Sequence, residues 1–275
     1  MNLYDAHAHY ADPELLKSWG ELSTHLEHIG LKYAVVNGTS PDDWPAVLKL
    51  AQQDTRIIPA IGLHPWSVNT APADWQDQLI AALKRGAQVI GEIGLDTWIE
   101  GADIQRQQDA FHWQLTQAAE RNLPVSIHCL KAIGPLMECL RSVDLPRRGI
   151  HLHAYNGPVE LIAELVTLGA YFSFNAGQLS PTHGKTTARI LAVPIERLLV
   201  ETDAPNMLPP PELRAFELPL SENANALTHP ATLKCGYEAI AKLRGVSCEQ
   251  LATGVAINFQ TYFLNATDQP RPTCA

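Results

Sequence analysis

The chain has 275 residues, of which 20 are basic and 29 acidic, so its formal net charge is −9 with neutral histidines. Hydrophobic residues make up 46% and charged residues 18%, which is typical of a folded globular protein and excludes a disordered chain. No stretch approaches the roughly 20 consecutive apolar residues of a membrane span, and the acidic balance argues against a long basic surface for duplex DNA. Five cysteines without a disulfide pattern, and an N-terminus without a secretory signal, predict a cytoplasmic protein.

Short β-rich runs alternate with longer amphipathic stretches along most of the chain. The runs predict strands at residues 3–9, 33–37, 57–61, 88–93, 124–128, 149–153, 170–174 and 198–203. The stretches between them predict helices at residues 13–28, 42–53, 74–85, 103–121, 131–142, 157–168 and 184–192. This alternation indicates a parallel sheet, and eight such units in about 200 residues favour an α/β fold, a closed (β/α)8 TIM barrel. A doubly wound open sheet is the alternative.

The pattern changes after the eighth predicted strand. Residues 204–230 contain a proline cluster and no clean periodicity, and we expect them to form a loop over the mouth of the barrel. Helices are predicted at 231–244 and 248–264. We therefore expect one barrel domain over residues 1–265 and a polar C-terminal tail at 266–275.

The predicted strands end in histidines and carboxylates. In a barrel of this kind the C-terminal ends of all strands meet at one rim, where the reacting groups lie. The rim therefore receives side chains from distant parts of the sequence: His7, His9, Glu92, His128, His153 and Asp203, with His64 from the loop after the third strand.

The spacing of these residues indicates a metal site. Residues two apart in a strand point to the same side, so His7 and His9 can face one ion. A carboxylate such as Glu92 has two oxygens and can bridge two ions. Nitrogen and oxygen ligands without thiolates suit Zn, Mn, Fe or Mg. His151 shares a face with His153, and it is either an additional ligand or a residue that supports a ligand from behind, or else a buried, hydrogen-bonded barrel histidine.

Six ordered motifs across residues 3–205 resemble the TatD-type metal-dependent DNases of the amidohydrolase superfamily. They are DAHAH at 5–9, GLHP at 62–65, GEIGLD at 91–96, PVSIH at 124–128, HAYNG at 153–157 and ETDAP at 201–205. The resemblance implies a TIM barrel and a metal-dependent hydrolase, in most members acting on phosphodiesters of DNA.

The resemblance also implies roles for individual residues. By position, the family's metal ligands are His7, His9, Glu92, His128, His153 and Asp203, which predicts divalent cofactors, two ions of Zn, Mn or Mg. Among them Asp203, with Glu92, is expected to be catalytic, because a carboxylate at a metal can both ligate it and take a proton from the attacking water. His64 matches a position that would contact the scissile phosphate.

The sequence departs from the family pattern in three places. An Arg-Asp pair that often follows the fifth-strand histidine is absent, and Lys131 is the candidate replacement toward the substrate phosphate, with a surface lysine as the alternative. The usual Cys-Phe-Ser-Gly after the sixth-strand histidine is here Ala154 to Gly157. The late Arg-Asn-Glu-Pro signature has no good match, and its nearest equivalent is residues 228–230.

Three functions follow from these observations. The first is a monomeric phosphodiesterase that trims nucleic-acid ends, more suited to single-stranded DNA than to duplex because of its acidic charge. The second is a metal-dependent hydrolase of a small-molecule ester, lactone or amide. The third is a barrel retained as a binding or assembly module without enzyme activity.

Overall fold

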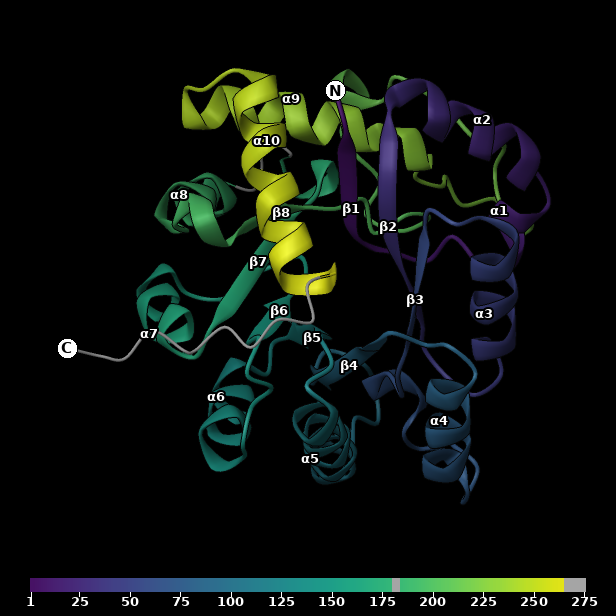
Figure 1. The fold of residues 1–275 in the computed structure, drawn as a ribbon, viewed down its shortest axis with the longest axis vertical. Helices are drawn as coiled ribbons and strands as arrows, with labels where there is room; N and C mark the ends of the chain where they lie inside the picture. Colours follow the sequence, from purple (N-terminus) through teal and green to yellow (C-terminus); the bar gives the residue numbers. More distant parts are fainter. Residues whose placement is uncertain (180–183, 265–275) are drawn as a thin grey trace.

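Eight parallel strands, each hydrogen-bonded to the next in chain order, surround the centre of the molecule (Figure 1). The computed structural model describes residues 1–179 and 184–264. The side chains of the strands are almost entirely buried, because one face of each strand points into the barrel and the other packs against helices. The strands are β1 (Leu3–Ala8), β2 (Leu31–Gly38), β3 (Ile57–Ile61), β4 (Val89–Asp96), β5 (Val125–Leu130), β6 (Ile150–Leu152), β7 (Ala170–Phe174) and β8 (Leu198–Val200).

The ends of β8 and β1 meet and nearly close the barrel. The backbone N–H of Asp203 donates to the carbonyl of His7 at 2.9 Å, and that of His9 donates to the carbonyl of Ala204 at 2.8 Å. Below them, the buried carboxylate of Asp5 accepts from the backbone N–H of Thr202 at 2.9 Å. The predicted TIM barrel is therefore confirmed, and the open doubly wound sheet is wrong.

The helices surround the strands as predicted, with three main differences in their limits. The predicted helix 157–168 is α-helical only from Ile162, after a 3-10 turn at Val159–Leu161. The predicted helix 13–28 is divided, because Ser18 leaves the helical conformation with φ −124° and ψ 23°. The predicted helix 248–264 ends at Phe259 and continues as a π-helical turn, Gln260–Leu264. The helices are α1 (Pro13–Leu16), α2 (Trp19–Ile29), α3 (Trp44–Gln53), α4 (Trp75–Lys84), α5 (Ile104–Arg121), α6 (Ile133–Ser142), α7 (Ile162–Thr167), α8 (Gly184–Ala192), α9 (Leu233–Arg244) and α10 (Cys248–Phe259).

The C-terminal helices hold the beginnings of two strands through buried tyrosines. The hydroxyl of Tyr262 accepts from the N–H of Val125 at 2.9 Å and donates to its carbonyl at 2.7 Å. The hydroxyl of Tyr237 makes the same pair of bonds with the backbone of Tyr4, at 3.2 and 2.9 Å. These contacts lie at the N-terminal ends of β1 and β5, at the end of the barrel opposite to the predicted functional groups.

The segment 204–230 has little regular structure and contacts both the strand ends and α2. Asn206 and Met207 line the cavity at the C-terminal ends of the strands. Farther along, the ring of Phe216 lies 5.1 Å from that of His25 on α2. Within the described residues no helix is long and apolar enough to cross a membrane.

Candidate metal centre

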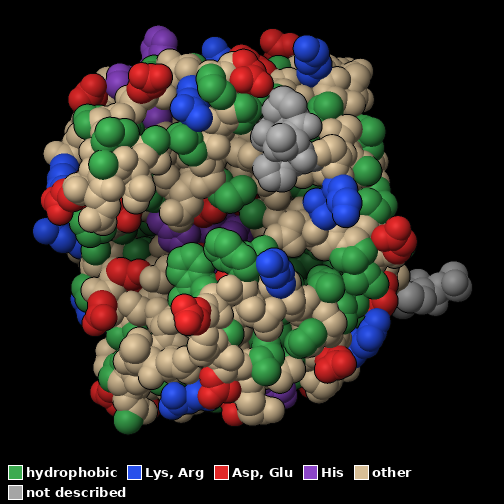
Figure 2. Space-filling view, turned by 180° about the vertical axis from the view of Figure 1, so that it is seen from behind, with side chains coloured by type: hydrophobic (Ala, Val, Ile, Leu, Met, Phe, Trp, Pro, Cys, Tyr) green, Lys and Arg blue, Asp and Glu red, His purple; other side chains and the backbone are tan. Residues whose placement is uncertain are grey.

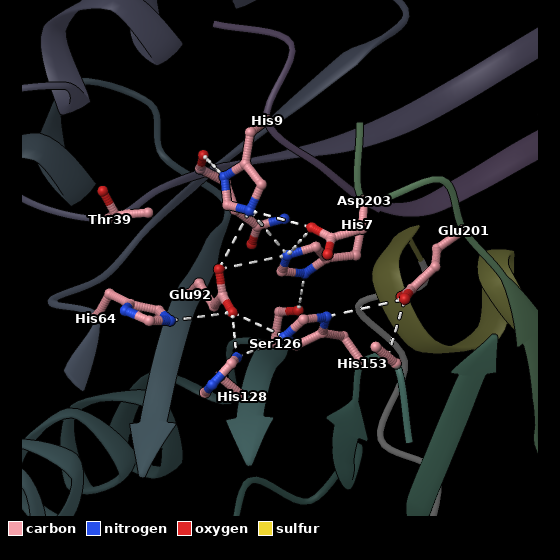
Figure 3. Close-up of polar contacts among 12 residues, drawn as sticks. His7, His9, Thr39, His64, Glu92, Ser126, His128, His153, Glu201 and Asp203 are labelled. Carbon is pink, nitrogen blue, oxygen red and sulfur yellow. Dashed lines mark hydrogen bonds and ion pairs between the residues drawn. The ribbon is translucent and has the colours of Figure 1, made fainter. Parts of the chain in front are cut away.

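A cavity of about 760 Å³ opens where the strands end. Figure 2 shows a hollow in this face of the molecule with histidine side chains inside it. Seven side chains gather at its base, from the ends of five strands and from the loop after β3. We call them the central cluster: His7, His9, His64, Glu92, His128, His153 and Asp203 (Figure 3).

Glu92 lies in the middle of the central cluster. Its Oε1 lies 2.7 Å from Nε2 of His153 and 3.0 Å from Nδ1 of His128. Its Oε2 lies 3.2 Å from Nε2 of His9 and 3.5 Å from Nε2 of His7. The two oxygens of one carboxylate thus face two different pairs of histidines (Figure 3).

Asp203 supplies a second carboxylate beside His7 and His9. Its Oδ1 lies 3.4 Å from Nε2 of His9 and 3.7 Å from Nε2 of His7. The residue has a φ of 55°, in the left-handed region, where aspartate is better tolerated than most residues. Three groups within the described residues bring potential ligand atoms within 4.8 Å of one another: His7–His153–Asp203, His7–His9–Glu92 and His64–Glu92–His128.

Hydrogen bonds outside the cluster determine which ring nitrogen points inward. Nδ1 of His9 donates to the carbonyl of Asn37 at 3.0 Å, so the neutral ring presents the Nε2 lone pair to Glu92. Nε2 of His128 donates to the carboxylate of Asp96 at 3.1 Å, so the neutral ring presents the Nδ1 lone pair. These are the arrangements found for histidines that bind metals.

His64 differs from His9 and His128, because the nitrogen that it points into the cavity carries a proton. Its Nδ1 accepts from the backbone N–H of Trp66 at 3.2 Å, so the proton of the neutral ring is on Nε2 and points toward Oε1 of Glu92, 3.3 Å away. Burial lowers the pKa of His64 to about 4, and the ring is therefore neutral near pH 7. Such a side chain can donate a hydrogen bond into the cavity but offers no lone pair to a metal.

The carboxylates of the cluster favour the ionised form. Burial raises the pKa of Glu92, but the surrounding His64, His153 and His7 more than compensate, and the pKa lies well below its ordinary value. Burial likewise raises the pKa of Asp203, while the hydrogen bond that His9 donates to it when its ring is protonated, together with the nearby histidines, reverses the shift. Two anionic carboxylates with inward lone pairs from imidazoles match the donor set of a divalent cation.

Other residues singled out from the sequence lie around this cluster. Lys131 is exposed at the rim, and its Nζ lies 5.9 Å from the centre of the Trp98 ring, outside the set of residues that line the cavity. His151 is fully buried and hydrogen-bonded to Ser126 and Ser173, which matches the buried barrel histidine among these expectations.

The counterpart of the late family signature does not line the cavity. His229 is buried, its Nε2 lies 3.1 Å from Nδ1 of His25 on α2, and its ring stacks against Phe216. Its own Nδ1 accepts from the backbone N–H of Ala231 at the start of a short 3-10 turn, Pro230–Thr232. Residues 228–230 therefore attach the preceding segment to α2.

Sequence reasoning missed two residues of the site. Asp96 is part of a motif noted above, but only the folded chain shows that its carboxylate holds His128 and also accepts from the indole of Trp66 at 2.7 Å. Arg189, on α8, lines the cavity and donates from Nε to the carbonyl of Gly157 at 2.7 Å. No motif or spacing marked this arginine.

Comparisons with known proteins agree with this architecture. A family model described as "TatD related DNase" matches residues 4–264. The "uncharacterized metal-dependent hydrolase YcfH" of Escherichia coli K12 is 30% identical over 273 residues, 96% of this chain and 96% of the relative. The "3'-5' ssDNA/RNA exonuclease TatD" of Citrobacter koseri is 27% identical over 263 residues, 95% of this chain and 98% of the relative. The crystal structure of YjjV, a TatD homolog from Escherichia coli K12, matches with a TM-score of 0.84 and 27% identity, covering 95% and 97% of the two chains. The resemblance inferred from the sequence is confirmed, and this chain belongs to the TatD related DNase family.

Proposed function

We propose that this chain is a metal-dependent phosphodiesterase that trims nucleic-acid ends, with single-stranded DNA as its preferred substrate. The observation that carries the proposal is the position of Glu92, whose two oxygens face separate pairs of inward-pointing histidines. This arrangement suits two divalent cations, Zn, Mn or Mg, held by His7, His9, Glu92, His128, His153 and Asp203. When bound, such cations lower the pKa of water and neutralise the charge that develops on a phosphoryl group.

The chain's own residues would then complete the reaction. Asp203 accepts the proton of the attacking water, because its carboxylate is ionised and lies at the edge of the cavity. His64 donates its Nε2 proton to an oxygen of the scissile phosphate, since its other nitrogen is already an acceptor.

Features around the cavity support a nucleic-acid substrate. The relative from Citrobacter koseri is named a 3'-5' ssDNA/RNA exonuclease. Trp66 and Trp98 line the cavity with 56% and 62% of their surface exposed, so they are free to stack against unpaired bases. Arg189 lines the same cavity, and Lys131 lies at its rim, where each can contact a backbone phosphate.

A small-molecule ester, lactone or amide is the second candidate substrate. It is favoured by one observation: residues 228–230, the counterpart of the family's arginine-containing signature, are buried against α2 and bring no cation to the cavity. Hydrolysis of simple phosphodiesters or small esters without degradation of oligonucleotides would support this alternative.

The decisive assay is degradation of end-labelled single-stranded DNA with added Mg, Mn or Zn. We expect progressive shortening by the wild type and a loss of orders of magnitude in turnover for Asp203→Asn. Asp77→Asn, a matched change at an exposed residue of α4, is the control. Near-normal turnover by Asp203→Asn would refute the role assigned to this carboxylate, and a metal-loaded wild type that does not shorten DNA would refute the nucleic-acid substrate.

Three further expectations remain predictions. The contacts of Asn206 and Met207 with the cavity support a role for segment 204–230 at the mouth. The free state of the four described cysteines supports a reducing cytoplasm. A monomer remains the expected oligomeric state.

A further inference from the structure

His7 differs from His9 and His128 in the partner of its outer nitrogen. His9 and His128 donate to a carbonyl and a carboxylate, which can only accept. Nδ1 of His7 lies 2.7 Å from the hydroxyl of Ser126, which can either donate or accept. The local contact therefore leaves open whether the proton of a neutral His7 is on Nδ1 or on Nε2, where it would point at the cation.

Ser126 is the first member of a row of buried hydrogen bonds below the central cluster. Its Oγ lies 3.3 Å from Nδ1 of His151, and Nε2 of His151 lies 2.6 Å from Oγ of Ser173. The hydroxyl of Ser173 is in turn hydrogen-bonded to Oε2 of Glu201. Each of these side chains, with His7, is at most 1% exposed. Figure 3 shows the two ends of the row, His7 with Ser126 and Glu201.

Glu201 determines which group donates and which accepts in each hydrogen bond of this row. Its Oε1 accepts from the backbone N–H of Ala154 at 2.9 Å and from Nδ2 of Asn175 at 3.0 Å. The amide of Asn175 cannot be turned round, because its Oδ1 accepts from the backbone N–H of Gln178 at 3.1 Å. With Oε1 occupied by these two donors, Oε2 of the carboxylate accepts from the hydroxyl of Ser173.

The donor and acceptor in each of the remaining hydrogen bonds then follow one after another. Ser173 uses its single O–H to donate to Glu201, so its oxygen accepts from Nε2–H of His151. A neutral imidazole protonated on Nε2 has its lone pair on Nδ1, which accepts from the hydroxyl of Ser126. The oxygen of Ser126 accepts in turn from Nδ1–H of His7. The lone pair of His7 is left on Nε2, which faces Oε2 of Glu92 at 3.5 Å.

From this we infer that Glu201 is a positioning residue that sets the metal-binding tautomer of His7 through Ser173, His151 and Ser126. The inference rests on the proposed function, in which His7 is a ligand. It assigns to Glu201, which follows β8, an effect on a residue of β1 to which it makes no direct hydrogen bond.

The substitution Glu201→Gln keeps the shape of the side chain but exchanges donor and acceptor in every hydrogen bond of the row. The two N–H donors at the Oε1 position require the amide oxygen there, so the NH2 group must face Ser173 and donate to it. Every later bond then reverses, Ser126 donates to Nδ1 of His7, and the proton of His7 moves to Nε2. Ser173→Ala interrupts the row instead, so that Ser126 is free to accept again.

The test is the tautomer of His7, measured by 15N–1H correlation spectroscopy of histidine side chains in metal-free protein, at a pH at which His7 is neutral. Its signals are assigned with a His7→Gln variant. We expect Nδ1–H in the wild type and Nε2–H in Glu201→Gln. An Nε2–H wild type, or a Glu201→Gln variant that keeps Nδ1–H, would overturn the inference. Neither measurement requires activity or bound metal, so a failure of the proposed function would be seen separately.

Zinc affinity, measured by competition with a chromophoric chelator, provides a second readout. We expect Glu201→Gln to weaken binding by about 10–100-fold, as for other partners of metal-binding histidines. The double variant Glu201→Gln/Ser173→Ala should bind more tightly than Glu201→Gln alone, because the interrupted row no longer forces the wrong tautomer. Damage to packing alone would make the double variant weaker than either single variant, and that result would contradict the proposed relay.

Discussion

Replacement of His64 by alanine tests whether its inward nitrogen is a hydrogen-bond donor to the substrate and not a metal ligand. His64 contacts the same carboxylate as the proposed ligands, and its Nε2 lies 3.3 Å from Oε1 of Glu92. Because Trp66 N–H occupies Nδ1, the nitrogen that faces the cavity carries the proton. We therefore expect His64→Ala to impair the reaction and to leave the bound metal in place.

The expected magnitude follows from the loss of one donor. The His64 side chain is buried and its pKa is lowered to about 4, so a neutral N–H would meet an anionic phosphoryl oxygen. Removal of one such donor typically costs 10²–10³ in kcat, or about 2.7–4 kcal/mol of transition-state stabilisation.

The assay combines turnover on end-labelled single-stranded DNA with metal content measured by atomic emission. His128→Ala is the matched control, since this ring presents a lone pair inward while Asp96 holds its other nitrogen. We expect His128→Ala to lose both metal and activity, and His64→Ala to lose activity alone. If His64→Ala lost metal to the same extent as His128→Ala, the donor assignment would be incorrect; an unchanged kcat would exclude contact with the reacting phosphate.

Three further substitutions test other parts of the structure. Asp96→Asn should weaken zinc binding by about 10–100-fold in a chelator competition, because an amide cannot accept from all the N–H groups that surround this carboxylate, including that of His128. Tyr262→Phe should lower the free energy of unfolding by about 2–4 kcal/mol in urea, because it removes both hydrogen bonds to the backbone of Val125. Burial lowers the pKa of His229 to about 4, so the unfolded chain binds a proton more readily and stability falls as pH decreases from about 6.5 to 4. His229→Asn should remove up to about 3 kcal/mol of that loss in unfolding experiments at a series of pH values.

Each of these has its own control. Unchanged zinc affinity in Asp96→Asn would show that Asp96 does not orient His128. Tyr33→Phe, at a half-buried tyrosine of β2, provides the comparison for Tyr262→Phe, and equal effects would contradict the special role of the buried hydroxyl. Asparagine at position 229 retains an acceptor for the N–H of Ala231, so an identical pH dependence in variant and wild type would locate the titration elsewhere.

The barrel and the membership of its central cluster could be predicted from the sequence. Alternating apolar runs and amphipathic stretches are local patterns, and parallel strands must bring their C-terminal ends to one rim. His7 and His9 could be placed together because residues two apart in a strand share a side. The division of the first helix at Ser18 and the π turn after Phe259 were not predicted, since both depend on what the helix packs against.

The sequence by itself thus determined which side chains meet at the strand ends, because that follows from strand order and a period of two. Only the tertiary structure decided what each side chain does there. The role of a histidine depends on the partner of its outer nitrogen, and these partners come from distant positions: Asn37 for His9, Asp96 for His128 and Ser126 for His7. Such pairings are set by the register of neighbouring strands and by packing inside the barrel, and no local pattern of residues records them.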